Sequence, residues 1–295
     1  MSPVDESDTS GGTELSGTVT WRELLSEATD RLRRIGAESD SRRIVEEACG
    51  VEPAELALVL GEPATEGGVA RFDSMVTRRS AGEPLQYVLG HWGFRQLDLA
   101  VDPRVLIPRP ETETVVQHAL DELDHLGARE VDTRVVDLGT GSGAIALSIA
   151  TERVRTRVWA TDASSDALAL AGANLAGTGR AATRVRLLEG DWFDALPDEL
   201  RGTLQMVISN PPYVATGADL PAEVIDWEPT AALLAGGDGL DDLRRIVADA
   251  LTGSSPEAFW SVRSHPSRPE RCQTSPKRAS RRCRSPTISP DAQGL

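Results

Sequence analysis

A glycine-rich turn at residues 139–143 joins a strand-like apolar run to a helix-like apolar run, and it constrains the fold more than any other stretch. The sequence from residue 134 to 152 reads RVVDLGTGSGAIALSIATE. Glycines after a buried strand allow a tight turn and a close approach of a ligand to the backbone, and the following helix offers free N–H groups at its start. Such turns bind many nucleotides, but some of them only pack, so the turn alone leaves both interpretations open.

Helix-like and strand-like stretches alternate on both sides of this turn. Helical patterns cover residues 112–127 and 165–177, and strand patterns cover residues 157–164, 184–194 and 204–213. This alternation predicts a doubly wound, mostly parallel α/β sheet. We assign this domain to residues 114–250.

The stretch before it predicts a small all-helical N-terminal domain over residues 19–84. Thr20 is expected to cap the first helix, with Glu23 as its capping-box partner, and Gly36 and Gly50 are expected to end the first and second helices. Such a bundle has no catalytic signature, so we interpret it as a packing or docking module. Residues 85–113 predict a hairpin-like connector that leads into a proline-fixed loop.

Charge and composition exclude several classes of protein. The chain has 295 residues and a net charge of −15, which argues against direct nucleic-acid binding. Its apolar runs are too short to cross a membrane. Residues 1–18 are acidic and small, and lack the pattern of a signal peptide, so we expect a disordered tail on a cytoplasmic, monomeric protein. The three cysteines have no metal-binding spacing.

Polar side chains follow the predicted strands at a single edge of the sheet. Asp162 ends the second strand, twenty-three residues after Gly139, and a carboxylate there can accept hydrogen bonds from both ribose hydroxyls. The alternative for Asp162 is a plain helix N-cap. Asp191 and Trp192 end the third strand, and Asn210 ends the fourth. Because ligands of open α/β sheets lie across the carboxyl ends of the strands, this agreement predicts one ligand site.

These motifs, in this order, resemble those of a known class of enzymes. The GTGSG turn, the acidic strand end and the NPPY turn at 210–213 resemble class I S-adenosylmethionine-dependent methyltransferases that modify planar amide or amino nitrogens. Three further motifs narrow this resemblance to the release-factor glutamine methyltransferases, the PrmC/HemK family. They are GEPLQYVLGHWGF at 82–94, DPRVLIPRPETE at 102–113 and, further on, LLAGGDGLDDLRRI. The resemblance extends from about residue 20 to about residue 250.

This resemblance implies a Rossmann-like methyltransferase sheet and S-adenosyl-L-methionine as the cofactor. It also implies protein-(glutamine-N5) methyltransferase activity on the Gly-Gly-Gln glutamine of class 1 peptide-chain release factors. For the cofactor it implies that the glycine turn cradles the methionine part, that Asp162 holds the ribose and that Asp191 and Trp192 flank the adenine. The residues implied for the cofactor are Gly139, Thr140, Gly141, Ser142, Gly143, Asp162, Asp191, Trp192 and Asn210. Arg109, Pro110 and Glu111 are expected to border the substrate entrance, with a purely structural role of that loop as the alternative.

The Asn-Pro-Pro-Tyr turn suits the chemistry of an amide nitrogen. Such a nitrogen is a poor nucleophile, because its lone pair is delocalised into the carbonyl. Asn210 can offer its side-chain oxygen and Pro211 its backbone carbonyl to the two N–H groups of the substrate amide. Pro212 stiffens the loop and Tyr213 can pack on the flat amide, which favours a geometry close to attack. A tight turn without chemistry is the alternative.

Other substrates and an unusual C-terminal segment leave alternatives open. A ribosomal-protein glutamine is a close rival substrate, and a nucleic-acid amino group is a more distant one. Residues 251–295 hold eight basic and three acidic residues among many Ser and Pro, so we expect disorder and missing C-terminal strands. Either this is a functional basic tail, or, as we favour, it is an aberrant C-terminus that could leave a catalytically impaired remnant.

Overall fold

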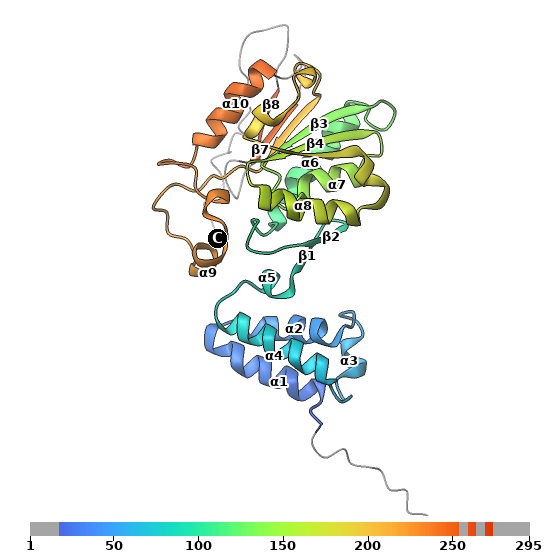
Figure 1. Ribbon diagram of the computed structural model, residues 1–295, viewed down its shortest axis with the longest axis vertical. Coiled ribbons are helices and arrows are strands. Elements are labelled where there is room, and N and C mark those ends of the chain that lie inside the picture. The colour runs from blue at the N-terminus through green and yellow to red at the C-terminus, as the bar shows by residue number, and fades with distance from the viewer. Residues whose placement is uncertain (1–17, 254–258, 264–268, 274–295) are drawn as a thin grey trace, which may run out of the picture. The chain divides into compact units, whose positions relative to one another are not determined.

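The structure is a computed structural model that describes residues 18–253, 259–263 and 269–273. The chain divides into two compact units, Met1–Leu89 and Gly90–Leu295. Each unit is drawn in Figure 1 and is described by itself. The predicted disorder of residues 1–17 lies outside the described residues.

The first unit is helical. Its helices are α1 (Trp21–Leu32), α2 (Ser41–Cys49), α3 (Leu56–Val59), α4 (Glu66–Ser80) and α5 (Leu85–Leu89). The predicted capping box at Thr20 and Glu23 is confirmed, and Gly36 and Gly50 adopt the left-handed conformation that ends a helix. Helix α3 is only four residues long, and turns precede and follow it.

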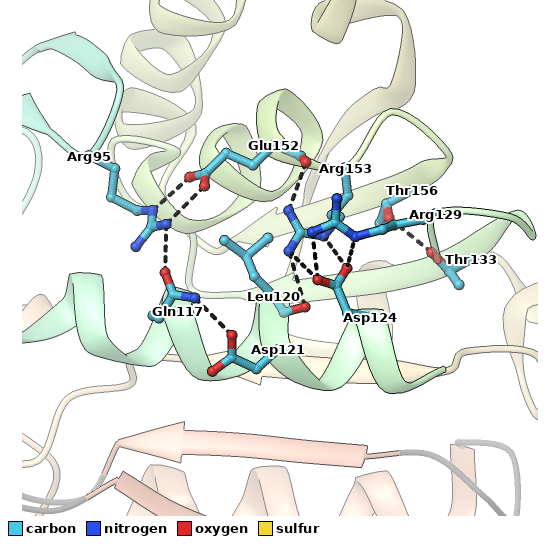
Figure 2. A network of polar contacts seen from close by, with 10 residues as sticks. All are labelled: Arg95, Gln117, Leu120, Asp121, Asp124, Arg129, Thr133, Glu152, Arg153 and Thr156. Carbon is cyan, nitrogen blue, oxygen red and sulfur yellow. Dashed lines mark hydrogen bonds and ion pairs between the residues drawn. The ribbon is translucent and has the colours of Figure 1, made fainter. Parts of the chain in front are cut away.

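A hairpin and its supporting helices open the second unit. Strands β1 (His91–Phe94) and β2 (Leu97–Ala100) pair in antiparallel register. Arg95 lies at the turn with a positive φ of 53°. Its guanidinium donates to Glu152 at 2.6 and 2.8 Å and to Gln117 at 3.1 Å, as Figure 2 shows. These bonds fasten the hairpin to helices α6 (Pro110–His125) and α7 (Ala144–Glu152).

A six-stranded sheet forms the centre of the second unit, with the strand order β5-β4-β3-β6-β7-β8. Its first four strands in chain order are β3 (Thr133–Leu138), β4 (Thr156–Asp162), β5 (Val185–Glu189) and β6 (Met206–Ser209), and neighbours among them are parallel. Helix α8 (Ser165–Gly177) connects β4 to β5. The chain runs outward from β3 to β5 and then returns to the other side of β3, so the topological switch point lies between β3 and β6. The predicted doubly wound, mostly parallel sheet is confirmed.

Both faces of this sheet are buried. Alternate residues of β3 and β6 face opposite sides, so that Val135 packs in one core cluster and Val136 and Val207 pack in another. Helices α6 and α7 cover the first face, and α10 (Asp241–Gly253) contributes Ile246 to the second (Figure 1). Burial on both sides is typical of a parallel sheet, and it leaves the carboxyl ends of the strands as the place for a site.

The segment after Leu251 corrects one expectation. Helix α10 continues to Gly253, and two strands follow, β7 (Phe259–Arg263) and β8 (Pro269–Gln273). Strand β7 pairs in parallel with β6, and β8 pairs antiparallel with β7. The prediction of missing strands and unbroken disorder is therefore wrong for these residues. An unpaired edge of β6 offers backbone N–H and C=O groups that even a short strand can satisfy. The rest of the predicted disordered tail lies outside the described residues.

Within the described part of the chain, no helix has the length and apolar character needed to cross a membrane.

Candidate active site

A cavity of about 540 Å³ opens at the carboxyl ends of the central strands. Ten of the residues singled out from the sequence line it: Arg109, Gly139, Thr140, Gly141, Ser142, Asp162, Asp191, Trp192, Asn210 and Pro212. Gly143, Glu111, Pro211 and Tyr213 do not belong to this lining. The structure therefore gathers segments from four strand ends and from the loop before α6 around one space.

Strand register brings these segments together. Leu138 of β3 stands opposite both Thr161 of β4 and Ser209 of β6. The Ser209 hydroxyl donates to the Leu138 carbonyl at 2.7 Å, in a buried position. Because the strands leave the sheet at the same level, the glycine turn after β3 and Asn210 after β6 begin side by side.

The glycine turn needs its glycines for backbone conformation and for space. Gly139, Gly141 and Gly143 have φ values of +70°, +54° and +86°, a region that other residues rarely adopt. A Cβ atom at Gly139 would lie 3.1 Å from the ring of Trp192, whereas a Cβ at Gly141 would meet nothing within 4 Å. The indole of Trp192 therefore lies over Gly139, and the space beside Gly141 is open.

Asp137 supports the turn from below, and sequence reasoning did not select it. Its side chain is fully buried, and its Oδ2 accepts hydrogen bonds from the Thr140 hydroxyl at 2.7 Å and from the Ala146 N–H at 3.2 Å. Its Oδ1 has no hydrogen-bond partner among the described residues. Burial raises the pKa of Asp137 from 3.8 to about 7, against the two hydrogen bonds, which lower it. An acidic residue inside an apolar strand, two positions before the first glycine of the turn, is the signal that could have revealed it.

Asp162 connects the end of β4 to the glycine turn. Its Oδ2 accepts from the Gly141 N–H at 2.8 Å, and its Oδ1 accepts from the Ser164 N–H at 2.9 Å. The interpretation of Asp162 as the N-cap of the next helix is wrong, because Ser164 takes that place and its hydroxyl accepts from the Ala167 N–H at 3.1 Å. Each carboxylate oxygen of Asp162 keeps further acceptor capacity beside the cavity.

Asp191 and Trp192 lie just beyond β5, which ends at Glu189 rather than at the predicted Asp191. The turn that carries them is strained, with φ values of 150° at Gly190 and 46° at Trp192. Arg245 of α10 holds this turn, because its guanidinium lies 2.5 Å from Asp191 Oδ2.

Helix α10 supplies one wall of the cavity, and the sequence did not identify it as part of the site. Asp242 and Arg245 both line the space. Burial raises the pKa of Asp242, and the negative charge of Asp191 raises it further. The resemblance reached this helix only as the motif LLAGGDGLDDLRRI, without a role for any side chain.

The NPPY turn begins where β6 ends. Asn210 lines the cavity, and its side-chain oxygen is buried without a hydrogen-bond partner among the described residues. The next residues are tied down, since the Val214 N–H donates to the Leu233 carbonyl at 3.0 Å and the Ala235 N–H donates to the Val214 carbonyl at 2.9 Å. Gly239 lies so close that a Cβ there would be 2.5 Å from the Tyr213 carbonyl oxygen.

Arg109 lines the cavity, but its guanidinium donates to the carboxylate of Glu228. Glu228 is another residue that sequence reasoning missed, and its side chain is only 1% exposed. Pro110 is the first residue of α6 and Glu111 lies in that helix's first turn.

The residues present fit S-adenosylmethionine. The volume lies in the range of small-molecule sites. The first N–H groups of a helix have no acceptor within the helix, and Ala144 and Ile145 at the start of α7 both line the cavity. They suit the carboxylate of an amino acid. The carboxylate of Asp162 suits hydroxyl groups, and the indole of Trp192 suits a flat base.

Comparison with known proteins agrees with this geometry. Residues 23–90 match the family model described as PrmC N-terminal domain, and residues 119–237 match the model described as methyltransferase small domain. A release factor glutamine methyltransferase of Xylella fastidiosa is 41% identical over 243 residues, which cover 82% of this chain and 83% of the relative. A relative with the same name from Gloeobacter violaceus is 43% identical, and the match covers 82% of this chain and 82% of the relative. Another from Bifidobacterium longum is 40% identical, and the match covers 77% of this chain and 81% of the relative. The chain therefore belongs to the release factor glutamine methyltransferase family.

Proposed function

We propose that this chain transfers a methyl group from S-adenosylmethionine to the side-chain nitrogen of the glutamine in the Gly-Gly-Gln motif of a class 1 peptide-chain release factor. The family supports a release factor as the substrate. The observation that carries the proposal is the buried oxygen of Asn210, which has no partner among the described residues. A buried acceptor without a donor is unfavourable, so this oxygen is prepared for a donor that arrives with a ligand.

A primary amide is the donor that this position suits. Its NH₂ group carries two hydrogens, and Asn210 and the adjacent Pro211 provide a side-chain oxygen and a backbone carbonyl. Two acceptors fix the plane of the amide, so that the nitrogen presents one face to the cavity. Pro212, which lines the cavity, restricts the backbone that carries both acceptors. We assign Tyr213 to pack its ring on the plane of the substrate amide.

The cofactor half of the cavity has its own set of residues. When bound, S-adenosylmethionine supplies an electrophilic methyl group. The turn from Gly139 to Gly143 holds the methionine part, Asp162 accepts from the ribose hydroxyls, and Asp191 and Trp192 flank the adenine. The Gly141 N–H bond to Asp162 supports this assignment, because it fixes the turn and the carboxylate relative to one another at 2.8 Å.

The chain's residues have a limited chemical task in this reaction. They hold the nitrogen in line with the methyl group and keep water out of the space between them. The proton of the methylated nitrogen leaves late, to water, so no residue of the chain has to act as a strong base.

The proposal extends to partner, assembly and location. A release-factor substrate places the enzyme in the cytoplasm, where translation ends. We expect a monomer without direct nucleic-acid binding, in line with the net charge of −15.

Transfer of a labelled methyl group tests the substrate class. The purified chain is incubated with labelled S-adenosylmethionine in three separate reactions. One contains a class 1 release factor, one contains ribosomal proteins and one contains RNA. Label on the release factor is expected, and it should disappear when the Gly-Gly-Gln glutamine is replaced by alanine. Label on a ribosomal protein alone, or on RNA alone, would contradict the proposed substrate.

A further inference from the structure

Two loops that are far apart in the sequence form one side of the cavity and share a buried ion pair. Ile107, Pro108 and Arg109 line the cavity from the loop before α6, and Pro229, Ala231 and Ala232 line it after α9 (Ala222–Trp227). Glu228 lies between α9 and the second lining segment, and connects it to the first. Its carboxylate accepts from the Arg109 guanidinium and from the Ile107 N–H, the latter at 3.3 Å.

Arg109 is a rigid anchor for this pair. It lies between Pro108 and Pro110, and both prolines restrict the backbone. It is also the N-cap residue of α6, and its carbonyl accepts from the Thr112 N–H at 2.9 Å. Since α6 buries Val115, Val116 and other apolar side chains in the core, Arg109 is fixed to the body of the second unit.

Helix α9 has no fully buried side chain of its own. None of its residues is buried, and Ile225 is 55% exposed. A short helix without a buried apolar side chain gains little from packing. Glu228, with a side chain only 1% exposed, is a deeply buried point of attachment for this segment. A carboxylate so deeply buried requires its cationic partner, because an unpaired charge there would be strongly unfavourable.

We propose that the Arg109–Glu228 ion pair positions the substrate-binding loop for methyl transfer, with Glu228 as a positioning residue. The loop from Asn210 to Glu228 is held near its start by β6 and by the Val214–Leu234 bridge, and at its end by this ion pair. Loss of the ion pair frees the C-terminal end of the loop. The loop can then move, and the acceptors for the substrate amide no longer hold its nitrogen in line with the methyl group. This inference rests on the proposed function, and it replaces direct substrate binding by Arg109 with a role through Glu228.

The test compares Glu228→Gln with a matched variant, Glu152→Gln. In the first variant the amide oxygen of the new side chain can still accept from the Ile107 N–H, so only the charged pair is lost. Glu152 forms a similar pair with Arg95, at 2.6 Å and with 10% of its side chain exposed, but it does not line the cavity (Figure 2). Both variants remove one buried carboxylate from an Arg–Glu pair, and they differ in their relation to the loop.

We expect Glu228→Gln to lower kcat for the release factor about tenfold or more, while the Kd for S-adenosylmethionine changes by less than about twofold. Glu152→Gln should lower Tm but leave kcat within about twofold. Arg109→Gln should lower kcat at least as much as Glu228→Gln, because it leaves the buried Glu228 carboxylate without a cation, and the double variant should be no worse than Arg109→Gln. An unchanged kcat in Glu228→Gln, an equal loss in Glu152→Gln, or additive losses from Arg109 and Glu228 would overturn the inference. If Glu228→Gln does not fold, the double variant Arg109→Gln/Glu228→Gln decides, because it leaves neither partner of the pair buried and charged.

Hydrogen exchange separates this inference from the proposed function. Backbone amides within residues 213–228 should exchange about tenfold faster in Glu228→Gln than in the unaltered protein or in Glu152→Gln, because a charge-assisted hydrogen bond no longer closes the loop. This readout does not depend on activity. Unchanged exchange would refute the positioning role even if the release factor is methylated, and faster exchange would support it even if another protein is the substrate.

Discussion

Replacement of Asp137 by Asn should change how the stability of the second unit depends on pH. Asp137 is fully buried beneath the glycine turn, and burial raises its pKa from 3.8 to about 7. The folded protein therefore holds a proton at this carboxyl that the unfolded chain has already released between these two pH values. The contribution to stability is fully present below about pH 3.8 and is lost as pH rises to about 7.

The magnitude follows from the two pKa values. A difference between 3.8 and about 7 corresponds to roughly 4 kcal/mol at most, when it is integrated over the whole range. Asn has the shape of the neutral acid, and its oxygen can still accept from Thr140 and from the Ala146 N–H. It has no proton to release, so the Asn variant lacks this pH-dependent loss.

Urea unfolding of both proteins between about pH 4 and pH 8, followed by tryptophan fluorescence, measures the effect. All other titrating groups are shared, so they cancel when one free energy of unfolding is subtracted from the other. The Asn variant should gain stability relative to the unaltered protein as pH rises, by up to roughly 4 kcal/mol across the range. A difference that does not vary with pH would refute the raised pKa and the argument from burial behind it.

Three further changes test other parts of the site and the fold. Asp162→Ala should raise the Kd for S-adenosylmethionine about tenfold or more in a calorimetric titration, since the carboxylate is assigned to the ribose; an unchanged Kd would remove that assignment. Gly190→Ala should lower stability by about 1–3 kcal/mol in thermal unfolding, because φ is 150° and a Cβ would lie 2.8 Å from Ala195 Cβ; an unchanged Tm would contradict the strain. Truncation after Gly253 removes β7 and β8, and light scattering should show aggregation through the exposed edge of β6; a stable, dispersed product would show that the two strands are dispensable.

Local patterns were sufficient for the parts of the fold that depend on short-range physics. The Thr20–Glu23 capping box and the glycine at position 50 act within one or two turns of helix, so their residue types predict their geometry. The cavity edge was also predictable. Parallel strands end on one side of a sheet, so Asp162 and Asn210 had to approach each other once the alternation of strands and helices was recognised.

Contacts between distant segments were not predictable from the same patterns. Glu228 lies 119 positions from Arg109, and nothing in its local sequence marks it as buried or paired. Arg245 reaches Asp191 across 54 positions. Such pairs depend on how loops from different strands meet, and one sequence does not contain that information.

The strands after Leu251 were missed for a related reason. Average composition over residues 251–295 is dominated by Ser, Pro and Arg, and it predicts disorder. The run FWSVR at 259–263 is short, and its pairing with β6 comes from the open sheet edge and not from the composition of the tail. Composition therefore describes the tail as a whole and fails for the few residues that have a partner.

Intact mass of a class 1 release factor, after incubation with this chain and S-adenosylmethionine, tests the central claim most directly. The account predicts the addition of one methyl group at the Gly-Gly-Gln glutamine. With Asn210→Ala it predicts no added mass, although that variant should still bind the cofactor. An unmodified release factor in the presence of the unaltered chain would contradict the proposed function, and full methylation by Asn210→Ala would contradict the role of the Asn210 oxygen.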